Sequence, residues 1–169
     1  MTSPSGVIVV GVDGSDTSRD ALRWALSQAA LTGSELRAVS SWRWPNYITR
    51  IPPGVDLAEE TSQVLDEVVD GVLAENPQAA GSVTVTKHVL EGPPGPALLT
   101  QAAGATLLVV GARGRAAFPG MLLGSVAEYC VREGTCPVVV VRAPDPPLSK
   151  APAGGQSAGE HSAEGRSAG

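Results

Sequence analysis

The chain has 169 residues, of which 43% are hydrophobic and 17% are charged, and its formal net charge at pH 7 is −5. This length and composition predict a single globular domain, and the negative charge argues against a general nucleic-acid-binding protein, which needs a basic surface. No apolar run is long enough to span a membrane, and residues 1–5 have neither the basic nor the apolar part of a signal peptide. We therefore expect a cytoplasmic protein with no membrane or nucleic-acid partner.

The first part of the chain alternates an apolar run with a helical pattern. Residues 6–12 are apolar and β-branched, which is typical of a strand buried on both faces. Ser15 is a candidate N-cap for a helix over 16–31, and Gly33 is suited to end it. A second strand is predicted over 36–41.

A segment rich in proline, residues 43–56, predicts a loop. Trp42, Trp44 and Tyr47 gather at its start. These aromatic side chains either pack beneath the loop, which is the simpler interpretation, or cover the base of a ligand.

A second helix, predicted over 57–75, carries an acidic face with no basic residue between the acidic ones: Asp56, Glu59, Glu60, Asp66, Glu67, Asp70 and Glu75. A solvated surface is the simpler interpretation of this face, and a basic partner is the alternative.

The rest of the domain continues the alternation. We expect strands at 83–90, 106–110 and 137–141, a short proline-led helix that ends near 103, and a helix over 126–133. Strands that alternate with helices predict an α/β fold with a doubly wound, mostly parallel sheet of five strands.

Two further features concern the second half of the chain. Cys130 and Cys136 are expected to be free thiols, because a reducing compartment disfavours disulfides and no nearby histidine completes a metal site. Residues 144–169 consist mostly of Pro, Ala, Gly and Ser, which predicts a disordered tail after a domain at 5–143.

The most distinctive motif is a glycine-rich loop between the predicted strand 106–110 and the helix that follows. Its glycines and serine are spaced as Gly-x2-Gly-x9-Gly-Ser: Gly111, Gly114, Gly124 and Ser125. Such a loop lets backbone N–H groups approach a phosphate, and Arg113 and Arg115 could supply countercharge.

Simpler interpretations of these residues exist. Ser125 and Glu128 have the spacing of a capping box, which would use the serine without any ligand. Asp13 and Gly14 could form only a turn, and Gly111 could simply end a strand.

The loop and four other segments together resemble the universal stress protein family. The loop is similar to the family's ATP-binding signature, and residues 7–15, 36–42, 91–99 and 135–142 are similar to its first strand with an acidic residue, its second strand, its third-helix entry and its closing strand. The resemblance runs over about 5–142. It implies the strand order 3-2-1-4-5 of the adenine-nucleotide alpha-hydrolase-like fold.

The implied topology brings the ends of the first and fourth strands to one crevice, where ligands bind in open α/β sheets. With the family's signature, this predicts an ATP site made of twelve residues: Gly11, Val12, Asp13, Ser40, Ser41, Gly111, Arg113, Gly114, Arg115, Gly124, Ser125 and Val126. Asp13 is expected at the nucleoside end, because a carboxylate repels triphosphate unless Mg²⁺ lies between them. Ser40 and Ser41, where the family often has histidine and a small or apolar residue, are expected near the adenine.

The resemblance also implies a homodimer that forms through the last strand, with Val138, Val139, Val140 and Val141. This strand would be an apolar sheet edge in the monomer, and pairing across a two-fold axis would cover it.

The chain lacks the Walker A lysine, the dinucleotide fingerprint and a Ser-His-Asp arrangement, so no catalytic residue is assigned. It is poorly equipped for fast phosphoryl transfer, which needs dense positive charge. The principal hypothesis is an ATP-binding regulatory protein of the stress response. The alternatives are a slow ATPase or self-phosphorylating protein, and a dimeric scaffold that binds no nucleotide.

Overall fold

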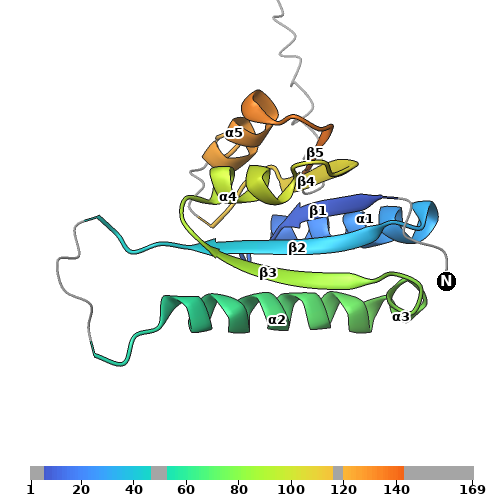
Figure 1. Ribbon diagram of the computed structural model, residues 1–169, viewed down its shortest axis with the longest axis horizontal. Helices are drawn as coiled ribbons and strands as arrows, with labels where there is room; N and C mark the ends of the chain where they lie inside the picture. Colours follow the sequence, from blue (N-terminus) through green and yellow to red (C-terminus); the bar gives the residue numbers. More distant parts are fainter. Residues whose placement is uncertain (1–5, 47–52, 116–119, 143–169) are drawn as a thin grey trace, which may run out of the picture.

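A computed structural model describes residues 6–46, 53–115 and 120–142, so the tail 144–169 and Tyr47 lie outside the described residues. Five parallel strands form one sheet in the order β3-β2-β1-β4-β5 (Figure 1). The strands are β1 (Val7–Gly11), β2 (Glu35–Trp42), β3 (Val85–Glu91), β4 (Leu107–Gly111) and β5 (Val138–Val141). The parallel sheet and its strand order are confirmed.

The helices follow the strands in alternation, as predicted, with one addition. They are α1 (Asp16–Thr32), α2 (Leu57–Glu75), α3 (Pro77–Ala80), α4 (Pro94–Gln101) and α5 (Ser125–Glu133). The unexpected α3 is a single turn that begins at Pro77, a residue whose fixed φ suits the first helical position. Within the described ranges, no helix combines the length and the apolar character that a membrane crossing requires.

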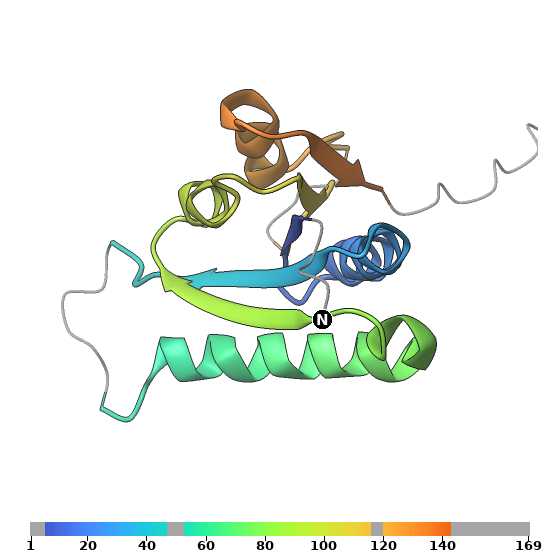
Figure 2. The same cartoon turned by 45° about the vertical axis from the view of Figure 1, so that its right-hand side comes forward.

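The sheet has a helical layer on each face (Figure 2). The side chains of β1 show the division, because Ile8 and Val10 pack with α1 and α2, whereas Val9 packs with α4 and α5. All three are at most 2% exposed. Both faces of the central strand are therefore dry, which explains its unbroken apolar run.

The first helix begins and ends where the sequence predicts. Ser15 is its N-cap and accepts a hydrogen bond from the N–H of Ser18 (3.2 Å), and Gly33 ends it in the left-handed conformation with φ of 65°. These caps place the first turn of α1 beside the carboxyl end of β1.

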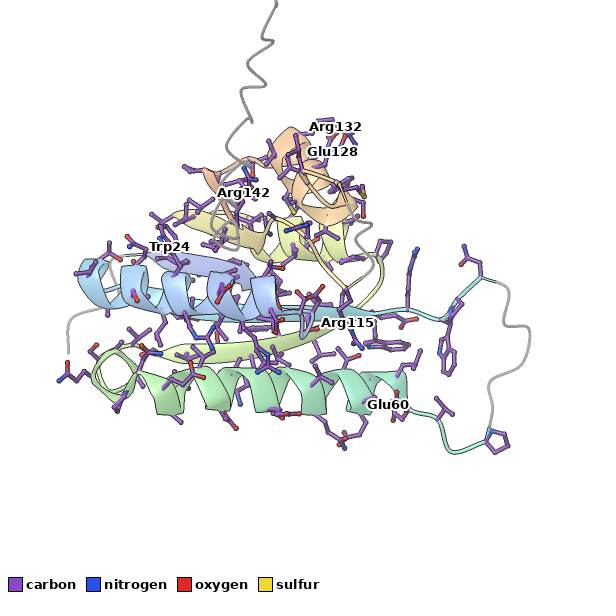
Figure 3. All side chains as sticks on the ribbon, turned by 180° about the vertical axis from the view of Figure 1, so that it is seen from behind. Trp24, Glu60, Arg115, Glu128, Arg132 and Arg142 are labelled. Carbon is purple, nitrogen blue, oxygen red and sulfur yellow. The ribbon has the colours of Figure 1, made fainter. Side chains whose placement is uncertain are left out.

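Neighbouring cations pair with part of the acidic face of α2. Lys87 of β3 bonds Asp66 and Asp70 at 2.7 and 2.8 Å, and Arg23 of α1 bonds Glu75 at 2.7 Å. Glu60, at the start of the helix, is exposed (Figure 3). The face therefore helps to hold α2 against β3 and α1 through exposed ion pairs, which contribute modestly.

Both cysteines are free, as expected. Cys130 is fully buried between α5 and the sheet. Burial, together with the nearby thiol of Cys136, raises the pKa of Cys130 to about 11. A thiol with this pKa stays protonated at neutral pH, so Cys130 acts as a small apolar core residue.

Candidate functional site

A cavity of about 570 Å³ lies at the carboxyl ends of β2, β1 and β4. Its volume is in the range of sites that hold small molecules. All twelve residues that the sequence predicts for the site line it: Gly11, Val12, Asp13, Ser40, Ser41, Gly111, Arg113, Gly114, Arg115, Gly124, Ser125 and Val126. The fold thus brings together segments that are more than a hundred residues apart in the chain.

The inner wall of the cavity is apolar. Val39 of β2, Leu98 of α4, Val110 of β4 and Ala127 of α5 line it, and each is at most 4% exposed. These residues belong to the core on the α4 and α5 side of the sheet. The cavity therefore offers a dry surface for a flat apolar group such as a nucleobase.

The charge of the cavity is opposite to that of the whole chain. Among the described residues that line it, Asp13 is the one carboxylate, whereas Arg43, Arg113 and Arg115 are cations. The chain as a whole carries a formal charge of −5. A local excess of arginine in an acidic protein favours an anionic ligand.

Asp13 connects the end of β1 to the start of α1 and to the glycine-rich loop. Its Oδ1 accepts hydrogen bonds from the N–H of Ser15 (3.0 Å) and from the Ser15 hydroxyl (2.6 Å), and its Oδ2 accepts one from the N–H of Arg115 (3.0 Å). Burial alone would raise the pKa of Asp13, but the bonds from Ser15 and Arg115 outweigh it and hold the pKa below its usual value. The carboxylate is therefore charged at neutral pH.

The carboxylate of Asp13 lies close to the glycine-rich loop, and its expected place at the nucleoside end stays a prediction. Its Oδ2 is only 2.6 Å from the place where a Cβ atom on Gly114 would lie. The carboxylate thus lies against the glycine-rich loop, where backbone N–H groups compensate its charge. Gly114 permits this approach, because any side chain there would displace Asp13 or the loop.

The first turn of α1 supports the same loop. The Thr17 hydroxyl donates a hydrogen bond to the carbonyl oxygen of Arg113. A Cβ atom on Gly111 would lie 3.0 Å from the carbonyl carbon and oxygen of Thr17. Gly111 therefore lets β4 end close to α1. This packing role is separate from the phosphate binding that the motif suggests.

The alternative interpretation of Ser125 as the N-cap of a capping box is wrong. Gly124 is the N-cap of α5 and makes no side-chain cap, and Ser125 is the first helical residue. The backbone fixes this boundary, because the N–H of Gly124 donates to the carbonyl of Ala112 (2.7 Å) and the N–H of Glu128 to that of Gly124 (3.0 Å). The Ser125 side chain is therefore not used for capping and lines the cavity at the start of α5.

Nine further described residues line the cavity and were not predicted: Ser18, Val39, Arg43, Gly92, Pro94, Leu98, Val110, Met121 and Ala127. One signal could have found Arg43. Side chains two apart in an extended chain point to the same side, so Arg43 follows Ser41 toward the cavity. Trp42 and Trp44 flank Arg43 and are half-buried, and neither lines the cavity.

A family model described as the universal stress protein family matches residues 5–142. Universal stress protein Rv1996 of Mycobacterium tuberculosis is 36% identical over 150 residues. The match covers 85% of this chain and 46% of that relative. The chain thus spans about half the length of the relative.

Solved structures agree with this assignment. A universal stress protein solved in complex with cAMP is 30% identical, with a TM-score of 0.60 and coverage of 82% of this chain and 98% of that one. A protein of the universal stress protein family from Burkholderia pseudomallei is 27% identical, with a TM-score of 0.59 and coverage of 85% and 100%. Because the family model matches most of the chain and the relative is 36% identical, the chain belongs to the universal stress protein family.

Proposed function

We propose that this chain binds ATP in the cavity at the carboxyl ends of β2, β1 and β4, and that it acts as a cytoplasmic regulatory protein of the stress response. One observation carries the proposal: the glycine-rich loop, the start of α5 and three arginines line the same cavity as an apolar wall. The loop, the helix start and the arginines suit the phosphates of a nucleotide, and the apolar wall suits its base. The 30% identical relative that was solved with cAMP supports an adenine nucleotide.

In this proposal the phosphates lie against the glycine-rich loop. The N–H groups at the start of α5 point to them, beside the Ser125 hydroxyl, and the helix dipole favours their charge. A Cβ atom on Gly124 would meet only ordinary contacts, none closer than 3.5 Å. The protein atoms therefore leave room at Gly124, and a phosphate oxygen could approach its backbone there.

The nucleoside lies over the apolar wall made by Val39, Leu98 and Val110. Ser40 and Ser41, which lie near the end of β2 at this side of the cavity, offer hydroxyl and backbone groups to the base. Mg²⁺, when bound with ATP, would neutralise part of the phosphate charge, and Asp13 is the one described carboxylate that faces the cavity. Its oxygens already accept three hydrogen bonds, so the phosphates would supply most of the metal's ligands.

A regulatory role follows from how the loop is held. Asp13 and Thr17 fix the loop at Arg115 and Arg113. Bound phosphates would compete with or reinforce these contacts, so that occupancy changes the order of the surface around the cavity. The bound fraction would then report the nucleotide concentration by mass action.

The proposal is tested by isothermal titration calorimetry with ATP, AMP and cAMP. The wild type is expected to bind ATP with a stoichiometry near one. Gly114→Asp is expected to abolish binding, because it adds a second carboxylate where Asp13 already lies. Gly71→Asp, in α2 and outside the cavity lining, is the matched control for added charge, because a Cβ atom there would meet nothing within 4 Å, and it is expected to retain most of the affinity. No heat with any nucleotide in the wild type would overturn the proposal.

We also propose a homodimer that forms through β5. This strand is an edge of the sheet and pairs only with β4 among the described residues. Its four valines are half-buried, so the strand presents apolar side chains and free backbone groups to a second copy.

A further inference from the structure

Arg43 lines the cavity from the end of β2, one residue beyond the last strand residue, Trp42. The side chain is exposed and lies at the rim rather than in the core. Gly92 and Pro94, at the entry to α4, lie beside this end of β2 and also line the cavity. The N–H of Gly92 donates to the carbonyl of Trp42 (2.8 Å), which joins these two segments.

The arginines of the cavity differ from most other cations of the chain. Lys87, Arg23 and Arg132 each make an ion pair of 2.7 or 2.8 Å with a carboxylate. Within the described residues, the guanidinium group of Arg43 makes no hydrogen bond or ion pair, and the same is true of Arg113 and Arg115. Their donors are available to a ligand.

The strand order places Arg43 on the opposite side of the cavity from the glycine-rich loop. β1 lies between β2 and β4, and adjacent strands are about 4.8 Å apart, so the ends of β2 and β4 are about 10 Å apart. Arg113 and Arg115 follow β4, whereas Arg43 follows β2. A nucleotide whose phosphates lie at the loop therefore directs its base toward Arg43.

We infer that Arg43 binds the base end of the nucleotide and that its planar guanidinium group stacks on the base. This inference rests on the proposed nucleotide binding. Arginine stacks on aromatic faces, and stacking at a partly exposed rim needs no reading of the base edge. Trp42 and Trp44 do not line the cavity, so they cannot cover the base. Arg43 covers the base in their place.

The test compares ATP with inorganic tripolyphosphate, which has the phosphates but no base, by calorimetry at one salt concentration. Arg43→Gln is expected to weaken ATP binding about 3- to 10-fold and to change tripolyphosphate binding much less. Arg43→Lys keeps the charge but removes the planar guanidinium group, so its loss of ATP affinity is expected to be nearly as large as that of Arg43→Gln. Arg132→Gln is the control for a lost charge, because Arg132 is on α5, away from the cavity (Figure 3).

The other outcomes overturn the inference. An equal loss for ATP and tripolyphosphate would make Arg43 a phosphate countercharge. Full ATP affinity in Arg43→Lys would show that charge alone matters, and an unchanged Arg43→Gln would show that the residue makes no ligand contact. Failure of the proposed function is distinct, because the wild type itself would then bind no ATP.

Discussion

At the scale of single residues, Asp13 organises the site. Its three hydrogen bonds come from two segments that are far apart in the chain, the start of α1 at Ser15 and the loop at Arg115. A charged acceptor makes stronger hydrogen bonds than a neutral one. Asp13 therefore fixes the loop geometry without a ligand, which would lower the entropic cost of the proposed nucleotide binding.

Asp13→Asn tests this role through pH. The hydrogen bonds lower the pKa of Asp13 in the folded state. Its stabilisation is therefore fully present above the unfolded pKa of about 3.9 and is lost as the pH falls through the folded pKa. We expect the variant to be about 1–2 kcal/mol less stable at pH 7 and the difference to shrink toward about pH 3. Urea unfolding at both pH values measures it.

Asp16→Asn is the matched control for this experiment. Asp16 is exposed in the first turn of α1. The substitution removes one negative charge, as Asp13→Asn does, at a residue outside the contacts with the loop. Its loss is expected to cost less, about 0.3–1 kcal/mol, through the helix dipole. Equal stability losses in both variants, with no dependence on pH, would contradict the role of Asp13.

At the scale of elements, the site depends on how closely β4 approaches α1. Gly111 ends β4 against the first turn of α1, and the Thr17 hydroxyl bonds the next part of the loop. The glycine-rich loop is thus held between the end of a strand and the start of a helix. This arrangement explains how a glycine-rich segment can have one defined geometry.

Gly111→Ala is expected to destabilise the fold. Its Cβ atom would lie 3.0 Å from backbone atoms of Thr17, which cannot move aside as a flexible side chain could. Overpacking of this kind costs about 1–3 kcal/mol. Chemical unfolding measures the loss, and a variant as stable as the wild type would contradict the contact.

Gly71→Ala is expected to have the opposite effect. Gly71 is exposed in the middle of α2, and a Cβ atom there would meet nothing within 4 Å. Alanine should stabilise the helix by about 0.5–1 kcal/mol, because glycine has more freedom to lose on folding. The same unfolding experiment would show a higher midpoint, and a lower one would contradict the description of α2 as a regular, solvated helix.

At the scale of the whole molecule, the sequence predicted the strand order and twelve of the residues that line the cavity. Apolar runs and caps such as Ser15 and Gly33 are local signals, so strands and helices could be found without a structure. That Gly92, Pro94 and Leu98 line the cavity could not be predicted, because the similarity of residues 91–99 to the family's third-helix entry implied no ligand contact, and an apolar residue looks the same in a core and in a pocket. The role of Gly111 against Thr17 depends on a contact between distant segments, and periodicity does not encode such a contact.

The edge of the sheet gives a prediction for assembly. The carbonyls of Pro137 and Val141 accept hydrogen bonds from β4, so by alternation the backbone of Val140 points outward. Val140→Pro would remove an outward N–H without breaking the β4 ladder, and it is expected to shift the proposed dimer to monomer. Light scattering with a size-exclusion column measures this shift.

Glu91→Pro is the matched control for assembly. By the same alternation its N–H points outward from β3, at the opposite edge of the sheet, and the residue is exposed. It is expected to leave the oligomeric state unchanged. A Val140→Pro variant that stays dimeric, or a Glu91→Pro variant that dissociates, would contradict the β5 interface.

The most direct test of nucleotide binding is to purify the chain without added nucleotide, denature it, and identify any released small molecule by mass spectrometry. We expect an adenine nucleotide at near-stoichiometric amount from the wild type and none from Gly114→Asp. Where nucleotide is lost during purification, added ATP is expected to raise the melting temperature of the wild type alone. A wild type that releases no nucleotide and shows no ATP-dependent rise would contradict nucleotide binding, and the glycine-rich loop would then serve only the fold.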